Sequence, residues 1–303
     1  GESVLALENA KTSAHVYAVP ANGNSVRQVS SGDGVHGAVS HSRSAGRLAF
    51  AYENSESAPE VYVSGREDFS RRKITSVNAD VPALKMGQTE LVSWTAPDGT
   101  RVEGLLTYPV GYDGGRVPLI LSVHGGPLVV HNRTFTGELG FPLVQASAQR
   151  GYAVLRPNPR GSTGYGQSFR AAVIENWGPG PFRDLMAGVD KAVEMGVAHP
   201  DSLAIMGWSY GGYLTAWTVT QTDRFAAANM GAGISNLISY QGTVYYPFTY
   251  NFLKHYMGGP FWDRYETYEE RSPIYHVKNV ETPTQILHGA EDEIVPPSQG
   301  REF

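Results

Sequence analysis

The first eighty residues consist of short segments in which apolar and polar side chains alternate, separated by turn residues. Alternation with a period of two, bounded by Gly, Asn and Ser, predicts short antiparallel strands. The pair Val16-Tyr17 recurs as Val61-Tyr62, an offset of 45 residues that suits one four-stranded blade of a β-propeller. The strands predicted in this way are residues 3–7, 15–19, 25–29, 37–40, 47–52, 60–63 and 72–75.

Residues 1–84 are therefore predicted to form most of one propeller blade and the whole of the next, without closing a ring. A propeller normally contains about four to eight blades, so further blades are expected upstream of this segment. The alternative interpretation is a small antiparallel β-extension of the domain that follows.

Beyond Thr89 the pattern changes to apolar runs that alternate with helical periodicity. The run Val117–Val123 has the length and β-branched content of a buried parallel strand. Residues 183–195 carry apolar side chains at helical spacing, which predicts a helix with one buried face. The other predicted elements are a hairpin of residues 91–94 and 102–108, helices over 139–149 and 213–220, and strands over 152–157, 203–206 and 284–288. This order predicts an α/β fold over residues 85–303, a mostly parallel sheet with helices on both faces.

The run Gly207-Trp208-Ser209-Tyr210-Gly211 follows a predicted strand and precedes a predicted helix. In that context the pattern G-x-S-x-G predicts the nucleophile elbow of an α/β-hydrolase. So sharp a turn forces the serine into a strained conformation, and side chains at Gly207 or Gly211 would collide with neighbouring backbone. Ser209 is therefore the candidate nucleophile.

The segment His124-Gly125-Gly126-Pro127 follows the predicted strand Val117–Val123. A Gly-Gly pair at the end of such a strand can leave a backbone N–H free to face the site, as in the H-G-G loops of lipases and esterases. The expected oxyanion donors are the N–H groups of Gly126 and Tyr210. The alternative is a tight turn without chemistry.

The acid of an α/β-hydrolase triad follows the serine in the chain, and the histidine follows the acid. Asp292 is the preferred acid because it lies just past the end of the predicted strand 284–288. Its neighbours Glu291 and Glu293 are either solvated loop charges or alternative acids.

The histidine of the triad has no candidate in the expected position. The chain has nine histidines, and the last of them, His288, precedes Asp292. We therefore expect the general base to lie beyond Phe303. His124 and His288 are expected to be structural, and an inverted order of the triad is the alternative. The histidines that remain as substitutes in that case are His124, His131, His255 and His276.

Five ordered motifs together resemble the prolyl oligopeptidase family, and most closely its acylaminoacyl peptidase and dipeptidyl-aminopeptidase-like branch. The resemblance covers residues 81–303 strongly and the first eighty residues loosely. It implies a β-propeller paired with an α/β-hydrolase domain that cleaves short peptides with a serine triad. The motifs are His124–Pro127, Asn158–Gly166, Asp184–Asp190, Gly207–Tyr213 and His288-Gly289.

The resemblance also implies roles for individual residues. It makes Ser209 the nucleophile, Tyr210 and Gly126 the oxyanion donors and Asp292 the acid, with the histidine some thirty residues beyond Phe303. The branch commonly has Arg two residues after the acid, where it holds a substrate carbonyl. This chain has Ile294 there, which makes Ile294 a further candidate residue of the substrate pocket. The residues that lie where the family lines its specificity pocket, which suggest an apolar residue next to the cleaved bond, are Ile234, Leu237, Tyr240 and Val295.

Composition narrows the picture only moderately. At 303 residues the chain suggests about two domains, and 41% apolar with 17% charged residues is ordinary globular composition. A net charge of −5 makes nucleic acid an unexpected partner, and no apolar stretch approaches the roughly 20 residues of a membrane span. The absence of cysteine excludes disulfides, thiol nucleophiles and cysteine metal sites, but it does not fix the compartment.

No cofactor or metal is expected, a homo-oligomer is left open, and the cytoplasm is slightly favoured over the periplasm or secretion. The first functional hypothesis is a serine exopeptidase or oligopeptidase that acts on short or N-acylated peptides. The second is a carboxylesterase of the same fold, which Ile294 favours. The third is a non-catalytic propeller-hydrolase scaffold, which the missing histidine favours.

Overall fold

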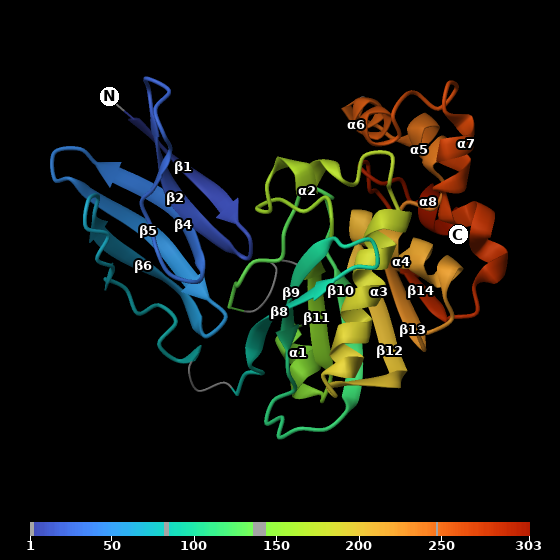
Figure 1. The fold of residues 1–303 in the computed structure, drawn as a ribbon, viewed down its shortest axis with the longest axis horizontal. Helices are drawn as coiled ribbons and strands as arrows, with labels where there is room; N and C mark the ends of the chain where they lie inside the picture. Colours follow the sequence, from blue (N-terminus) through green and yellow to red (C-terminus); the bar gives the residue numbers. More distant parts are fainter. Residues whose placement is uncertain (1–2, 82–84, 136–143, 247) are drawn as a thin grey trace.

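The computed structural model of the chain describes residues 3–81, 85–135, 144–246 and 248–303. It contains two β-sheets, and the helices gather around the second of them (Figure 1). The strands of the N-terminal sheet are β1 (Ser3–Ala10), β2 (Ser13–Pro20), β3 (Arg27–Gln28), β4 (Val35–Ser42), β5 (Arg47–Asn54), β6 (Ser57–Gly65) and β7 (Arg72–Lys73).

The N-terminal sheet has the repeat that the sequence predicts. Strands β4, β5, β6 and β7 pair antiparallel in that order and form one four-stranded blade. Strands β1, β2 and β3 repeat β5, β6 and β7, and β3 (Arg27–Gln28) lies 45 residues before β7 (Arg72–Lys73). A small core that includes Val16, Leu48 and Phe50 holds this sheet together.

The second sheet has the order β14-β13-β12-β10-β11-β9-β8. The pairings from β14 to β11 are parallel, whereas β9 pairs antiparallel with both β11 and β8. The strands of this sheet are β8 (Thr89–Thr95), β9 (Arg101–Thr107), β10 (Val117–Val123), β11 (Ala153–Asn158), β12 (Ala198–Trp208), β13 (Ala227–Gly231) and β14 (Thr284–Leu287).

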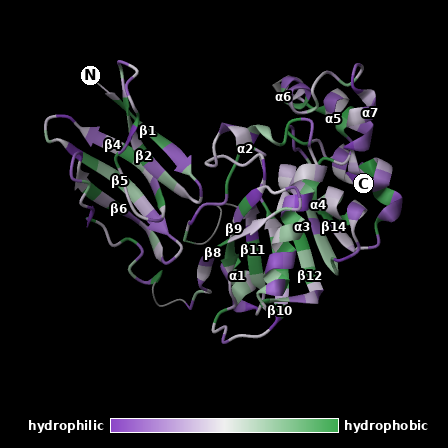
Figure 2. Ribbon diagram, viewed as in Figure 1, coloured by the Kyte–Doolittle hydropathy of each residue, from purple (hydrophilic) through white to green (hydrophobic). Residues whose placement is uncertain are grey.

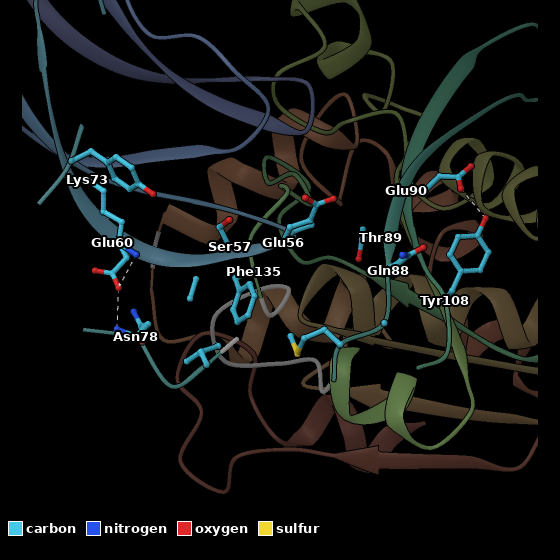
Figure 3. Close-up of a pocket in the computed structure, with 16 residues that line it drawn as sticks. Glu56, Ser57, Glu60, Lys73, Asn78, Gln88, Thr89, Glu90, Tyr108 and Phe135 are labelled. Carbon is cyan, nitrogen blue, oxygen red and sulfur yellow. Dashed lines mark hydrogen bonds and ion pairs between the residues drawn. The ribbon is translucent and has the colours of Figure 1, made fainter. Parts of the chain in front are cut away.

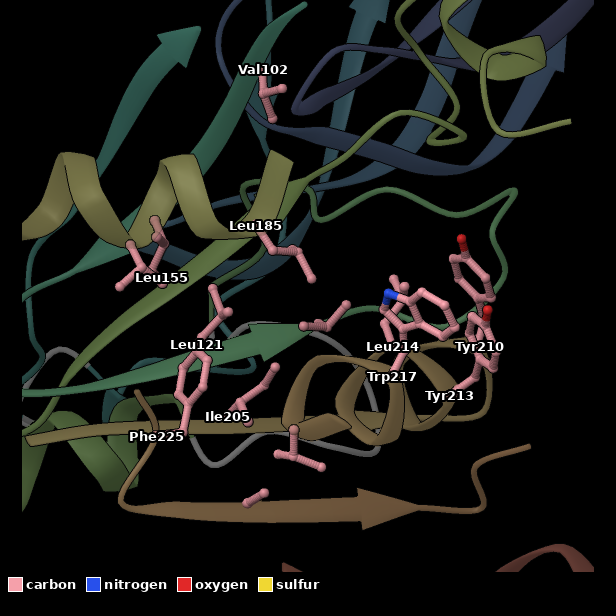
Figure 4. Close-up of a cluster of buried hydrophobic side chains, with 14 of the residues drawn as sticks. Val102, Leu121, Leu155, Leu185, Ile205, Tyr210, Tyr213, Leu214, Trp217 and Phe225 are labelled. Carbon is pink, nitrogen blue, oxygen red and sulfur yellow. The ribbon is translucent and has the colours of Figure 1, made fainter. Parts of the chain in front are cut away.

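Helices α3 and α4 pack against this sheet, with α3 over β8, β9, β11 and β12 and α4 over β10, β12 and β13. The apolar side chains of the strands and the two helices form the main core (Figures 2 and 4). The helices are α1 (Val144–Gln149), α2 (Gln167–Ala171), α3 (Pro179–Glu194), α4 (Tyr210–Gln221), α5 (Leu237–Thr243), α6 (Phe248–Tyr256), α7 (Tyr265–Glu270), the 3-10 helix η2 (Pro273–Asn279) and α8 (Ser298–Glu302).

Three predicted helices have different bounds in the structure. Helix α4 covers residues 210–221 rather than 213–220. Helix α3 begins at Pro179 rather than at residue 183, because Gly178 has a φ of 92° and Pro179 can occupy the first helical position. Helix α1 covers residues 144–149 of the predicted helix 139–149, and residues 139–143 lie outside the described part of the chain. Among the described residues, no helix combines the length and the apolar character that crossing a bilayer requires.

Candidate active site

Ser209 lies on the turn between strand β12 and helix α4, in the strained conformation that the sequence predicts. Its φ and ψ are 57° and −118°, a region that residues with a side chain rarely adopt. A Cβ atom at Gly207 would lie 2.4 Å from the oxygen of Gly211, and one at Gly211 would lie 2.2 Å from the oxygen of Val123. Neighbouring backbone atoms therefore approach so closely that both positions of the elbow require glycine.

Backbone hydrogen bonds fix Ser209 on both sides. Its N–H donates to the oxygen of Gly231 (2.9 Å), and its own oxygen accepts from the N–H of Tyr213 (2.9 Å). The side chain of Ser209 makes no capping bond to α4, although the residue occupies the N-cap position. Tyr210 is the first residue of α4, and its N–H has no acceptor within the helix. The helix therefore offers a backbone donor beside the half-buried serine.

The segment His124–Pro127 follows strand β10, which pairs in parallel with β12 so that Val123 lies opposite Gly207. A Cβ atom at Gly125 would lie 3.3 Å from the oxygen of Trp208 and 3.7 Å from the Cβ of Ser209. Gly126 has a φ of +114°, which favours glycine, and a Cβ there would lie 2.6 Å from the N of Leu128. The structure thus brings the glycine pair against the elbow.

His124 is held inside the protein next to this segment. Its Nε2 is hydrogen-bonded to the Oγ of Ser162 (2.9 Å), and its Nδ1 lies 2.7 Å from the oxygen of Gly125. Complete burial lowers the pKa of His124 to about 4. Because both ring nitrogens are engaged away from Ser209, His124 is structural, as the sequence analysis expects.

A buried ion pair holds the segment that contacts His124. Arg160 binds Asp184 through its main-chain N–H (2.8 Å), its Nε (2.9 Å) and a terminal nitrogen (2.6 Å). It also binds Asp98 at 2.7 Å, and this guanidinium holds the pKa of Asp98 well below its usual range. The carboxylate of Asp184 is completely buried. Arg160 and Asp184 lie within two of the motifs that resemble the family, but the sequence alone predicted no role for either residue.

Asp292 follows strand β14 and forms a tight turn with the residues after it. Its Oδ1 accepts hydrogen bonds from the N–H groups of Ile294 and Val295, both 2.9 Å long. Its Oδ2 lies 4.0 Å from the Nε2 of His288, which instead bonds to the oxygen of Val295 at 2.7 Å. Asp292 is half-buried, whereas Glu291 and Glu293 are exposed. Of the three carboxylates, Asp292 is therefore the one whose orientation is fixed by hydrogen bonds within this turn.

The remaining candidate histidines are engaged elsewhere. His131 lies with its Nε2 3.2 Å from the oxygen of Ser122, and His276 bonds to the oxygen of Glu270 at 2.9 Å. The ring of His255 packs against that of Tyr256. All nine histidines belong to the described residues, and none of the hydrogen bonds between described residues joins a histidine to Ser209.

The five candidate pocket residues divide into two groups. Ile294 is 55% exposed on the loop after Asp292. The other four are buried in the main core, and they are Ile234, Leu237, Tyr240 and Val295. Ile294 is therefore the member of the set that presents an accessible side chain in this structure.

Aromatic side chains pack against the first turn of α4, next to the elbow. The sequence did not predict this cluster. Trp177 lies with its ring centroid 4.5 Å from that of Tyr210 and 5.7 Å from that of Tyr213. Figure 4 shows Tyr210 and Tyr213 side by side on α4, beside Trp217. Burial raises the pKa of Tyr210 well above its usual value, so the phenol stays neutral. Trp177 precedes α3 by two residues and carries no periodic signal of its own.

A cavity of about 600 Å³ lies between the two sheets (Figure 3), and Ser209 is not among the residues that line it. Its lining comes from β6, β7, β8 and the segments beside them and includes Glu60, Lys73, Glu90 and Tyr108. Glu60 is buried there and accepts hydrogen bonds from Thr75 and from the N–H groups of Val77 and Asn78. Its carboxylate therefore anchors the segment after β7. Among the described residues, no group of three or more acidic or histidine side chains could hold a metal ion.

The sheet order and a strained serine at the end of a central strand define an α/β-hydrolase, preceded here by β-propeller blades. The sequence profile of the prolyl oligopeptidase family matches residues 141–303, more than half of the chain. The chain belongs to the prolyl oligopeptidase family.

Three proteins that are similar to this chain are named as peptidases. The uncharacterized peptidase YuxL of Bacillus subtilis is 40% identical over 218 residues, 71% of this chain and 32% of YuxL. Dipeptidyl aminopeptidase BIII of Pseudoxanthomonas mexicana is 37% identical over 257 residues, 80% of this chain and 36% of the relative. The acylaminoacyl peptidase of Pyrococcus horikoshii matches all of this chain with a TM-score of 0.88 at 26% identity, over 47% of its own chain. The chain thus spans about a third of the length of the two curated relatives.

Proposed function

We propose that the protein is a serine peptidase that hydrolyses short or N-acylated peptides through an acyl-enzyme intermediate. The observation that carries this proposal is the closeness of the glycine pair to the elbow, where a Cβ atom at Gly125 would lie 3.7 Å from the Cβ of Ser209. The names of the relatives, a dipeptidyl aminopeptidase and an acylaminoacyl peptidase, support a peptide substrate. We place the domain boundary at residues 84 and 85, with incomplete propeller blades before it and the hydrolase domain after it.

In this proposal the Oγ of Ser209 attacks the carbonyl carbon of the substrate, and its proton passes to a histidine. The oxygen of the tetrahedral intermediate accepts hydrogen bonds from the N–H groups of Tyr210 and Gly126. Removing a single oxyanion donor typically lowers kcat by about 10² to 10³, so two fixed donors account for much of the catalysis. Asp292, with Oδ2 free of the turn that engages its Oδ1, orients the histidine.

We further propose that the histidine of the triad follows Phe303 in the gene product. Support comes from the hydrogen bonds that His124, His131, His276 and His288 make with groups other than Ser209. In hydrolases of this fold the histidine comes after the acid, which agrees with this order. The expected signal is a histidine within about 40 residues of Phe303, on a loop after one further strand.

A second candidate function, a carboxylesterase, is favoured by the side chain of Ile294. Where the branch commonly has a cation for a substrate carbonyl, this chain exposes an apolar side chain that cannot donate a hydrogen bond. An ester substrate has less need of such an anchor than a peptide. Comparing kcat/KM for acyl-aminoacyl anilides with that for p-nitrophenyl esters distinguishes the two functions.

The test of the proposed chemistry is covalent labelling of the gene's full-length product with a fluorophosphonate probe. We expect one label, on Ser209, and no label on the Ser209→Ala variant, because the probe reacts with an activated serine. Turnover of an acyl-aminoacyl anilide should disappear in the same variant. A wild-type protein that takes no label and turns over neither substrate would instead support a non-catalytic scaffold.

A further inference from the structure

The turn of the first hairpin in the N-terminal sheet touches the loops of the candidate active site. We call residues 9–12, between the ends of β1 and β2, the hairpin turn. Lys11 has a φ of 56°, the left-handed conformation that a lysine seldom adopts. Its N–H points out of the hairpin and donates to the oxygen of Gly164 at 2.9 Å. A residue with a side chain keeps such a backbone conformation only where the surrounding structure fixes it.

The contact at Gly164 is close enough to require glycine. Gly164 has a φ of +85°, and a Cβ there would lie 2.9 Å from the N and 3.1 Å from the oxygen of Lys11. The ammonium of Lys11 also reaches the buried carboxylate of Glu103 at 2.8 Å. Main chain and side chain of one turn residue are thus held by the hydrolase part of the chain.

Further hydrogen bonds join the hairpin turn to the segment after the glycine pair. The Oδ1 of Asn9 accepts from the Nδ2 of Asn132 (3.0 Å), and the oxygen of Thr12 accepts from the N–H of Arg133 (2.8 Å). Arg133 also donates from its Nε to the Oγ1 of Thr12 at 3.3 Å. Thr12 is buried by these contacts. The hairpin turn therefore contacts two loops of the hydrolase at once.

The first of these loops contains the glycine pair, and the second packs against it. We call residues 124–132 the oxyanion loop and residues 158–164 the bracing loop. The N–H of Thr163 in the bracing loop donates to the oxygen of Val129 in the oxyanion loop at 3.1 Å. A Cβ at Gly161 would lie 3.2 Å from the Cβ of Pro127, directly after the glycine pair. The bond between Ser162 and His124 joins the same two loops.

We propose that the hairpin turn is a clamp that fixes the oxyanion loop, so that Asn9 and the main chain of Lys11 are positioning residues for Gly126. The inference rests on the function proposed above. The oxyanion loop leaves β10 and passes close to Ser209 at Gly125, and its far side is held by the bracing loop and the hairpin turn. Without the turn, the N–H of Gly126 loses part of what fixes its direction. Blade and catalytic domain are thereby coupled through the oxyanion hole.

Two glycines provide a matched test in the gene's full-length product. Gly164 and Gly166 have nearly the same φ, +85° and +89°, but only Gly164 faces the hairpin turn, and a Cβ at Gly166 has no atom within 4 Å. Gly164→Ala and Gly166→Ala therefore both place a side chain at a positive φ, and only the first displaces the clamp. We expect Gly164→Ala to lower kcat for an ester by about ten- to a hundredfold with KM little changed, and Gly166→Ala to retain kcat.

A second measurement follows the loop itself. Deuterium exchange of peptides that cover residues 124–132 should be faster in Gly164→Ala than in the wild type, and unchanged in Gly166→Ala. Asn9→Ala, at a half-buried position, should lower kcat in the same direction and decides the matter if Gly164→Ala does not fold.

The outcomes separate this inference from the proposed function. Equal kcat and equal exchange in Gly164→Ala and Gly166→Ala, with Ser209 still labelled, overturn the clamp and leave the peptidase intact. A wild-type protein without turnover or label overturns the proposed function, and the exchange comparison alone then decides whether the turn fixes the loop.

Discussion

The hydroxyl of Tyr240 donates a hydrogen bond of 2.9 Å to the main-chain oxygen of Ile294. On the other side of the same residue, the N–H of Ile294 donates to Oδ1 of Asp292. The backbone of Ile294 is thus held between helix α5 and the candidate acid, while its side chain is 55% exposed. The side chain can therefore be exchanged without moving Asp292.

Replacing Ile294 by Arg tests whether a missing cation weakens peptide binding. A charged hydrogen bond contributes about 1.5–3 kcal/mol, so Ile294→Arg is expected to raise peptide turnover relative to ester turnover by about ten- to a hundredfold. The measurement is the ratio of kcat/KM for an acyl-aminoacyl anilide to that for a p-nitrophenyl ester. Ile294→Leu is the control and should keep the wild-type ratio. An unchanged ratio in Ile294→Arg places the peptide anchor elsewhere.

Replacing Asp292 by Asn tests the acid with little risk to the fold. The Oδ1 of an asparagine can still accept from the N–H groups of Ile294 and Val295, so the turn should be retained. We expect kcat to fall by about 10⁴, the effect known for the same exchange in the Ser-His-Asp triad. Glu291→Gln and Glu293→Gln are matched controls on the exposed neighbours. Loss of turnover in one of these controls, with Asp292→Asn active, would identify another acid.

The polypeptide of residues 1–303 alone is expected to hydrolyse esters only at a residual rate. None of the hydrogen bonds between its described residues joins a histidine to Ser209, and a serine hydroxyl without a base is a poor nucleophile at neutral pH. Compared with the full-length gene product, kcat should be lower by about 10⁴ to 10⁶. Comparable turnover in the two proteins would contradict the proposed position of the histidine and direct the search to His124, His131, His255 and His276.

Gly211→Ala is expected to destabilise the fold, whereas Gly242→Ala is not. Both glycines are in helices, but a Cβ at Gly211 would lie 2.2 Å from the oxygen of Val123, and one at Gly242 has no atom within 4 Å. Overpacking of this kind costs at least about 1–3 kcal/mol, and an exposed Gly→Ala exchange in a helix gains up to about 1 kcal/mol. Urea unfolding of the two variants beside the wild type measures the difference. Equal unfolding midpoints would mean that β10 can shift away from α4.

The stability of the N-terminal sheet is expected to fall on acidification because of His36. Burial lowers the pKa of His36 to about 4, and its ring packs against Tyr52 while its Nδ1 bonds to the oxygen of Ala14. The unfolded chain takes up this proton near pH 6.5, while the folded chain stays neutral down to about pH 4. The free energy of unfolding therefore decreases as the pH falls from 6.5 to about 4, by up to about 1.4 kcal/mol per pH unit.

The measurement for His36 is the pH dependence of the melting temperature between pH 6.5 and 4.5. His36→Gln keeps a donor for Ala14 and removes the titrating group, so its melting temperature should depend less on pH than that of the wild type. Parallel curves for the two proteins would assign the acid sensitivity to other buried histidines.

The elements that the sequence predicts well are those with local causes. The turn at Ser209 needs small residues at fixed positions, so its strain leaves a pattern in five consecutive residues. The apolar run Val117–Val123 coincides with strand β10 because it is buried in the middle of the sheet. The 45-residue repeat is visible because β2 and β6, which correspond in the two blades, each carry a Val-Tyr pair, although Val16 is buried and Val61 is 37% exposed. Each of these signals is contained within one element or one repeat.

The features that the sequence did not predict depend on distant partners. Arg160 and Asp184 are 24 residues apart, and no local pattern shows that the carboxylate is completely buried beneath the guanidinium. Trp177 is packed against aromatic side chains of two helices, α4 and α6, which periodicity within one helix cannot indicate. The contact between Lys11 and Gly164 spans more than 150 residues and depends on how the two sheets meet.

The strained backbone of Ser209 has a consequence for the evolution of this chain. A residue with a side chain in such a conformation raises the free energy of the folded state by about 1–3 kcal/mol, and glycine at the same place is nearly free of that strain. Glycine in place of this candidate nucleophile is thus expected to stabilise the fold. We therefore expect a gene copy that is released from selection for the proposed hydrolysis to accept glycine at this position, and serine to persist where that selection continues.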